Sequence, residues 1–134
     1  MDPLNELTSR IIGAAIEVHR VLGPGMLESV YEACLVHELE ERGLEVQRQK
    51  PVPVVYKGES IEVGFRLDLL VNDAVVVEVK CVDALHAIHE AQALTYLRFT
   101  GKHVALICNF KTRILTDGLQ RVVRGHGPWS VPGR

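Results

Sequence analysis

The sequence predicts an α/β fold in which helices cover both faces of one mixed β-sheet. Apolar residues recur at helical spacing in the N-terminal third of the chain, and an alternating pattern replaces this spacing between Leu44 and Lys80. A helical pattern then returns ahead of a short, wholly apolar segment, Val104–Cys108, which is typical of a strand buried on both faces. Helices on both sides of the strands in the sequence favour a layered α/β or α+β domain.

Two helices are expected before any strand. The first begins at Asp2 and Pro3, an N-cap residue followed by proline at the first helical position, and ends at the glycines and proline of residues 23–25. The second runs from about Met26 to Arg42, and Gly43 stands where a left-handed C-terminal cap belongs.

The next segment predicts four strands, over residues 44–50, 52–56, 61–71 and 74–80. Pro51 and Pro53 lack the N–H that a central ladder needs, so their segment should lie at a sheet edge or a bulge. A third helix is expected over about Ala84–Phe99, and a last helix over Thr116–Val123. The expected order is therefore ααββββαβα.

Composition indicates one domain, which we place at residues 1–124, followed by an irregular tail at 125–134. The chain has 134 residues, 47% of them apolar, and a net charge of −2, which counts against a protein that only coats nucleic acid. No apolar run has the length of a membrane span and no signal peptide is evident, so we expect a cytoplasmic protein without membrane contact. The three cysteines are widely spaced and predict neither disulfides nor a zinc site.

Three ionisable residues interrupt strands that should be buried: Asp68, Glu78 and Lys80. Charges are rarely buried unless they are paired or bound to a metal. Glu78 and Lys80 are two apart in a strand and share a face, and two carboxylates converging there would suit Mg²⁺ or Mn²⁺. The lysine could orient an attacking water or neutralise phosphate charge. The alternative is a buried salt bridge between Lys80 and one carboxylate.

The register of the hairpin that joins these strands decides whether such a site can form. A two-residue loop at Asn72 and Asp73 would place Asp68 opposite Val77, and Glu78 would then point to the other face. An odd-length connection places Asp68 opposite Glu78 on one face. We therefore predict an odd-length connection or a compensating bulge.

Two helical motifs flank the acidic pair. A G-x-x-E-x-x-Y motif begins the second helix and places Glu28 and Tyr31 on one helical face, although the helix dipole by itself also favours a carboxylate in the first turn. In the third helix, Gln92, Tyr96 and His89 form a polar stripe that could contact phosphate oxygens, and the tyrosine could stack on a base. A satisfied, half-buried polar stripe is the alternative, and it is favoured for His89.

In this order and spacing, the motifs resemble those of the GxxExxY proteins, small members of the PD-(D/E)XK nuclease superfamily. The resemblance extends to about Val123 and rests on these segments: the G-x-x-E-x-x-Y motif, Tyr56-Lys57-Gly58, Arg66-Leu67-Asp68-Leu69-Leu70, Glu78-Val79-Lys80, and Ile88-His89-Glu90-Ala91-Gln92 with Tyr96. It implies a restriction-endonuclease-like core in which Asp68, Glu78 and Glu28 are metal ligands and Lys80 is the catalytic lysine. Gln92 and Tyr96 resemble the QxxxY element of RecB-like and Cas4-like nucleases, which lies near the nucleic-acid strand.

The leading interpretation is a Mg²⁺- or Mn²⁺-dependent nuclease that hydrolyses phosphodiester bonds of DNA, in preference to RNA. Some relatives hold an iron–sulfur cluster, which three scattered cysteines cannot ligate, so no cluster is expected. The alternative is a non-catalytic binding or assembly protein that keeps the nuclease fold. The slightly acidic charge and a mean hydropathy of +0.11 support it, and the surplus of apolar residues predicts a homo-oligomer.

Overall fold

The computed structural model describes residues 2–125, except for the side chain of Val63. In chain order its elements are α1 (Pro3–Leu22), α2 (Glu28–Glu41), β1 (Val46–Tyr56), β2 (Glu59–Val71), β3 (Val75–Lys80), α3 (Ala87–Thr100), β4 (Val104–Asn109), the 3₁₀ turn η1 (Leu115–Gly118) and β5 (Leu119–Val123). The predicted tail lies outside the described residues, apart from its first residue, Gly125. The predicted α/β fold with a mixed sheet is confirmed.

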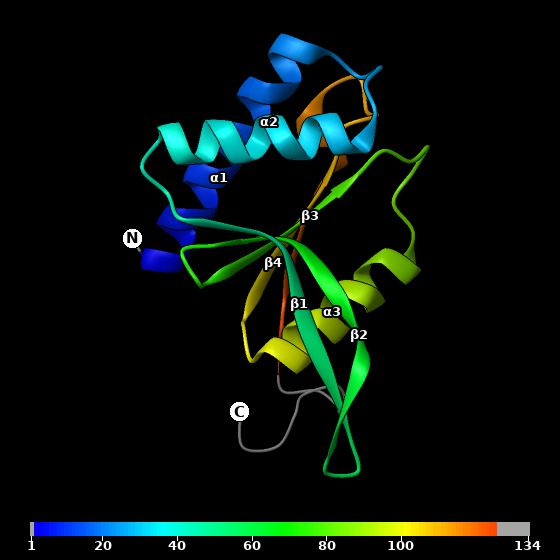
Figure 1. The fold of residues 1–134 in the computed structure, drawn as a ribbon. Coiled ribbons are helices and arrows are strands. Elements are labelled where there is room, and N and C mark those ends of the chain that lie inside the picture. The colour runs from blue at the N-terminus through cyan, green and yellow to red at the C-terminus, as the bar shows by residue number, and fades with distance from the viewer. Residues whose placement is uncertain (1, 126–134) are drawn as a thin grey trace.

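The strands form one sheet in the order β1-β2-β3-β4-β5, in which β3 and β4 are parallel and the other neighbours are antiparallel. The helices α1 and α2 lie on one face of this sheet and α3 lies on the other (Figure 1). None of the helices in the described part of the chain has the length and apolar character needed to cross a membrane.

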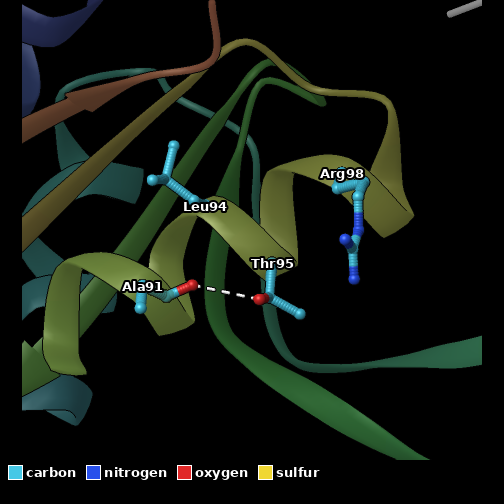
Figure 2. Close-up of a pocket in the computed structure, with 4 residues that line it drawn as sticks. All are labelled: Ala91, Leu94, Thr95 and Arg98. Atoms are coloured by element: carbon cyan, nitrogen blue, oxygen red, sulfur yellow. Dashed lines mark hydrogen bonds between the residues drawn. The ribbon is translucent and has the colours of Figure 1, made fainter. Parts of the chain in front are cut away.

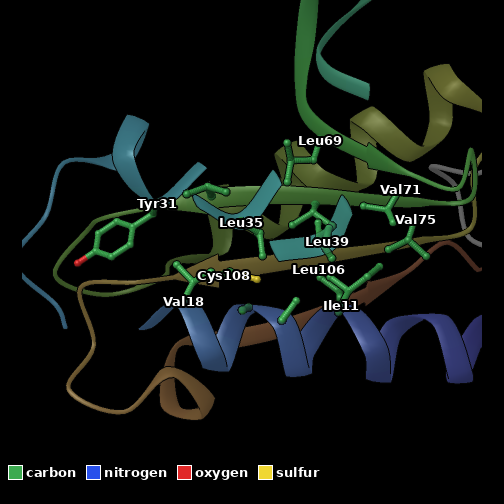
Figure 3. Packing of buried hydrophobic residues seen from close by; sticks show 14 of the residues in the cluster. Ile11, Val18, Tyr31, Leu35, Leu39, Leu69, Val71, Val75, Leu106 and Cys108 are labelled. Atoms are coloured by element: carbon green, nitrogen blue, oxygen red, sulfur yellow. The ribbon is translucent and has the colours of Figure 1, made fainter. Parts of the chain in front are cut away.

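Each face of the sheet carries its own apolar core. The core beneath α1 and α2 contains Val75, Val77 and Val79 of β3, and Figure 3 shows part of it between the helices and the strands. The core beneath α3 contains Val76 of the same strand. Because successive side chains of a strand point to opposite faces, Glu78 and Lys80 point to the α3 side.

The segment around Pro51 and Pro53 lies at a sheet edge, as predicted, but it forms one strand with its neighbours. The two predicted strands 44–50 and 52–56 join into β1, whose pairing with β2 shifts register between Val52 and Val54. An edge strand needs N–H donors on one side only, so the prolines bend the ladder without ending it. Gly64 faces this bulge, where a Cβ atom would lie 2.1 Å from the carbonyl oxygen of Val52.

The helix predicted over Thr116–Val123 is wrong. These residues form the end of η1 and then β5, which pairs with β4 from Val104–Val123 to Cys108–Leu119. All six residues of β4 are buried, and its backbone needs a hydrogen-bonding partner on the side away from β3. Hydrogen bonding of β5 to β4 therefore overrides the local helical spacing. The observed order of elements is ααβββαββ.

Candidate metal centre

The turn between β2 and β3 sets the positions of both predicted carboxylates. Leu69 pairs with Val77 and Val71 with Val75, so residues 72–74 form a three-residue connection. The predicted odd-length connection is confirmed, and its register places Asp68 opposite Glu78. Asn72 and Asp73 supply the left-handed backbone of the turn, with φ values of 50° and 52°. Asparagine and aspartate tolerate that conformation better than most residues.

Beyond the Leu69–Val77 pair, the two carboxylates connect the strands. The N–H of Asp68 donates to Oε2 of Glu78 over 3.0 Å, and the N–H of Val79 donates to Oδ2 of Asp68 over 2.8 Å. Each carboxylate is therefore held by the backbone of the opposite strand. Within the described residues, no hydrogen bond reaches Oε1 of Glu78, and Oδ1 of Asp68 accepts only a long contact of 3.4 Å from Gln49.

The environment of these two carboxylates disfavours their charged forms. Glu78 is only 4% exposed, and burial, followed by repulsion from Asp68, raises its pKa to about 8. Burial also raises the pKa of Asp68, against the hydrogen bond from Val79. Lys80 lowers both pKa values through its charge, yet within the described chain it forms no ion pair with either carboxylate. The buried salt bridge considered from the sequence is therefore not formed.

A third carboxylate, missed by the sequence analysis, approaches the pair from α2. Glu32 is 7% exposed, and its charge contributes to the raised pKa of both Asp68 and Glu78. Its oxygens accept from Arg48 Nε over 2.8 Å and from Gln49 Nε2 over 2.6 Å. The helical spacing carried a signal for it, because Glu32 precedes the buried Leu35 and Leu39 on one face of α2.

Glu28, the predicted third ligand, lies elsewhere. It is exposed at the start of α2 and lines a hollow with Cys81 and Lys111. Its charge raises the pKa of Cys81, after burial of that thiol. Glu32, one helical turn further along α2, is the acidic residue of this helix that faces the pair.

Tyr31 stabilises the loop before α2. Its side chain is fully buried and stacks on Phe110, with ring centroids 4.6 Å apart. Its hydroxyl donates to the carbonyl oxygen of Gly23 and accepts the N–H of Met26 over 3.0 Å. With both functions of the hydroxyl engaged, Tyr31 supports the loop rather than offering a surface for substrate.

The predicted polar stripe of α3 divides into three environments. Tyr96 stacks on Phe65 at 4.6 Å, and its pKa is raised by burial and then by the charges of Glu78 and Asp68, so it lies within the field of the acidic pair. Gln92 is exposed one turn before it. The ring Nδ1 of His89 accepts the N–H of His86 over 2.9 Å, which closes the first turn of the helix and supports the structural alternative for this histidine.

A hollow of about 210 Å³ lies on α3, lined by Ala91, Leu94, Thr95 and Arg98 (Figure 2). The hydroxyl of Thr95 donates to the carbonyl oxygen of Ala91 over 3.0 Å, within the helix. No carboxylate lines this hollow, so it is not the place where the acidic pair meets.

The acidic pair fits a divalent cation chemically. Two carboxylates meet at one strand junction, neither forms an ion pair with Lys80 in the described chain, and each keeps one oxygen without a short hydrogen bond. The described residues contain no group of three or more His, Cys, Asp or Glu side chains arranged to hold a metal.

A comparison with protein-family models matches residues 5–122 to the PD-(D/E)XK nuclease superfamily. The chain belongs to the PD-(D/E)XK nuclease superfamily. Its mixed sheet flanked by helices is consistent with the restriction-endonuclease-like fold of this superfamily. Nucleases of the PD-(D/E)XK type generally depend on a divalent metal and act on nucleic acids. Neither curated proteins nor solved structures yielded a match.

Proposed function

We propose that this chain is a divalent-metal-dependent nuclease that hydrolyses phosphodiester bonds of DNA, in preference to RNA. Asp68 and Glu78 hold the metal, Mg²⁺ or Mn²⁺, and Lys80 is the catalytic lysine. One observation carries the proposal: the two carboxylates meet across the β2–β3 junction, each anchored by the backbone of the other's strand. The sequence motifs further support a place among the GxxExxY proteins.

The roles of the residues follow from their positions. A bound divalent cation would stabilise the charge on the phosphate and help to activate the attacking water. Lys80 projects from the same face of β3 as Glu78, so its ammonium group can orient that water or neutralise charge on the phosphate. Tyr96 and the exposed Gln92 lie on the helix that covers this face, where they can contact the nucleic-acid backbone.

Glu32, and not Glu28, which the family resemblance implied as a metal ligand, is the acidic residue of α2 that supports this site. Its contacts with Arg48 and Gln49 connect α2 to the strand beside Asp68. Because two donors already bind its oxygens, Glu32 is suited to orienting the residues around the metal ligands.

The test is cleavage of labelled single- and double-stranded DNA and RNA with Mg²⁺ or Mn²⁺. We expect metal-dependent products from DNA, and a loss of at least about 100-fold in Asp68→Asn and Glu78→Gln. The matched control is Asp83→Asn, which changes an exposed aspartate that pairs with Lys111 over 2.6 Å. Cleavage that survives in both site variants would sink the mechanism, and wild-type protein inert on every substrate would favour a non-catalytic role.

A second candidate function is a binding or assembly protein that forms homo-oligomers on the nuclease fold. Large apolar side chains are exposed on the helical layer, among them Leu27 at 74% and Val21 at 64%. Exposed apolar residues of this size are common at interfaces between subunits. Light scattering tests the oligomer, because a uniform mass of 14.9 kDa would mean a monomer.

A further inference from the structure

Gln49 has a backbone conformation that is unusual for a strand residue. It lies within β1, yet its φ is 51°, in the left-handed region that L side chains rarely adopt. Arg48 and Lys50 on either side pair with Leu69 and Leu67, while Gln49 interrupts the ladder. Such a conformation costs free energy and persists where the surrounding structure over-determines it.

The left-handed turn directs two consecutive side chains to one carboxylate. In a regular strand, the side chains of Arg48 and Gln49 would point to opposite faces of the sheet. Here Arg48 Nε lies 2.8 Å from one oxygen of Glu32, and Gln49 Nε2 lies 2.6 Å from the other. The left-handed backbone at Gln49 therefore turns the side-chain amide of Gln49 toward Glu32, next to the guanidinium group of Arg48.

The same amide reaches the acidic pair. Gln49 Nε2 also lies 3.4 Å from Oδ1 of Asp68, the oxygen that does not accept the N–H of Val79. One NH₂ group thus lies between two carboxylates from different elements, Glu32 on α2 and Asp68 on β2. The charges of Asp68 and Glu32 repel each other, and an NH₂ donor between them offsets part of that repulsion, together with Arg48 at Glu32 and the N–H of Val79 at Asp68.

We propose that Gln49 is a positioning residue of the metal centre, whose side-chain amide joins Glu32 to Asp68 and orients Asp68 for the cation. This inference rests on the proposed function. Groups that orient a ligand from behind commonly change metal affinity by about 10- to 100-fold when they are removed. We expect an effect of that size at Gln49.

Two substitutions distinguish the effect of the side-chain amide of Gln49 from the effect of its strained backbone. Gln49→Met keeps the length of the side chain but removes the donor, whereas Gln49→Gly removes the donor and relieves the left-handed backbone. Lys57→Gly is the matched control, because Lys57 has a φ of 49° in the turn of the same hairpin and its described contact is with the ring of Tyr56. If the amide is what matters, Met and Gly at position 49 weaken the site alike.

The decisive measurement is the Kd for Mn²⁺ in the full chain, followed by electron paramagnetic resonance of free Mn²⁺. We expect about 10- to 100-fold weaker binding in Gln49→Met and Gln49→Gly, and unchanged binding in Lys57→Gly. A folded Gln49→Met protein that binds Mn²⁺ as tightly as wild type overturns the inference and leaves the proposed function standing. If wild-type protein does not bind Mn²⁺, both the inference about Gln49 and the proposed function are wrong.

A second measurement covers the case in which the Gln49 variants do not fold. In wild-type protein labelled with ¹⁵N, we expect the side-chain NH₂ resonance of Gln49 to shift as Mg²⁺ is added, and to stay in place in Asp68→Asn. A resonance that does not move, while Mg²⁺ shifts the backbone signals of Asp68 and Val79, overturns the inference.

Discussion

Asp68 and Glu78 lie opposite each other at the point where β2 and β3 stop pairing through their backbones, and the Asp68 N–H donates to Glu78 Oε2 over 3.0 Å. The two acids thus replace a ladder hydrogen bond and share a buried site without an ion-pair partner among the described residues. Burial, together with their mutual repulsion, makes the metal-free site sensitive to pH.

The first prediction concerns stability and pH in the absence of metal. The pKa of Glu78 is about 8 in the fold, against an ordinary glutamate pKa of 4.5, so the folded state binds the proton of Glu78 more tightly. The resulting stabilisation is complete below about pH 4.5 and is lost as the pH rises through about 8. We expect the Tm measured in EDTA to fall over this interval, and Glu78→Gln to flatten that part of the profile.

The matched control for this experiment is Glu62→Gln, which changes an exposed glutamate of β2. It should retain the wild-type dependence of Tm on pH. A wild-type Tm that is constant or rises over the interval would show that Glu78 is already ionised.

The second prediction concerns coupling between metal and proton. Because a metal binds the ionised carboxylate, cation binding should release a proton from Glu78 below about pH 8. We expect the affinity for Mg²⁺ to rise with pH, by up to about tenfold per unit, and to level off above that pKa. Calorimetry in two buffers of different ionisation enthalpy counts the released protons. Equal heats in both buffers at neutral pH would contradict the coupling.

The third prediction separates chemistry from metal binding at Lys80. Since Lys80 forms no ion pair with Asp68 or Glu78, Lys80→Met should leave the Kd for Mn²⁺ within a few fold and lower cleavage by at least about 100-fold. The control, Lys102→Met, removes a lysine that pairs with Asp73 over 3.2 Å and should leave cleavage unchanged. Full activity in Lys80→Met would exclude the lysine from the reaction.

The fourth prediction concerns Tyr31. Tyr31→Phe removes the hydroxyl that connects Gly23 and Met26, and leaves two backbone groups without that partner. We expect a loss of about 2 kcal/mol in the free energy of unfolding, measured in urea, with unchanged affinity for Mn²⁺. A variant of wild-type stability that cleaves DNA poorly would instead point to contact with substrate.

The fifth prediction tests the bulge in the β1–β2 hairpin. A Cβ at Gly64 would meet the backbone of Val52 at 2.1 Å, so Gly64→Ala should lower stability by about 2 kcal/mol or more. Gly25→Ala is the control, because a Cβ there meets nothing within 4 Å. Thermal melts of equal Tm for Gly64→Ala and wild type would mean that the hairpin can shift to accept a side chain.

The elements that could be predicted from the sequence are those whose cause is local. Asp2 accepts the N–H of Leu4 at the start of α1 over 2.8 Å, and Gly101 ends α3 in a left-handed conformation. The odd-length turn at residues 72–74 sets the register that brings Asp68 and Glu78 to one face, as predicted. Each of these signals lies within a few residues of the element that it determines.

The sequence by itself therefore predicted the layered α/β class, the position of the proline segment at an edge or bulge, and a hairpin register that brings Asp68 and Glu78 to one face. Only the tertiary structure decided that Leu119–Val123 is a strand, because this segment pairs with the buried strand β4, and the apolar spacing within the segment does not reveal that pairing. It also decided that Glu32, and not Glu28, faces the acidic pair, and that Gln49 lies between two carboxylates. The positions of Glu32 and Gln49 depend on how α2 packs against β1. A helical or alternating pattern within one segment does not show which other segment it will pack against.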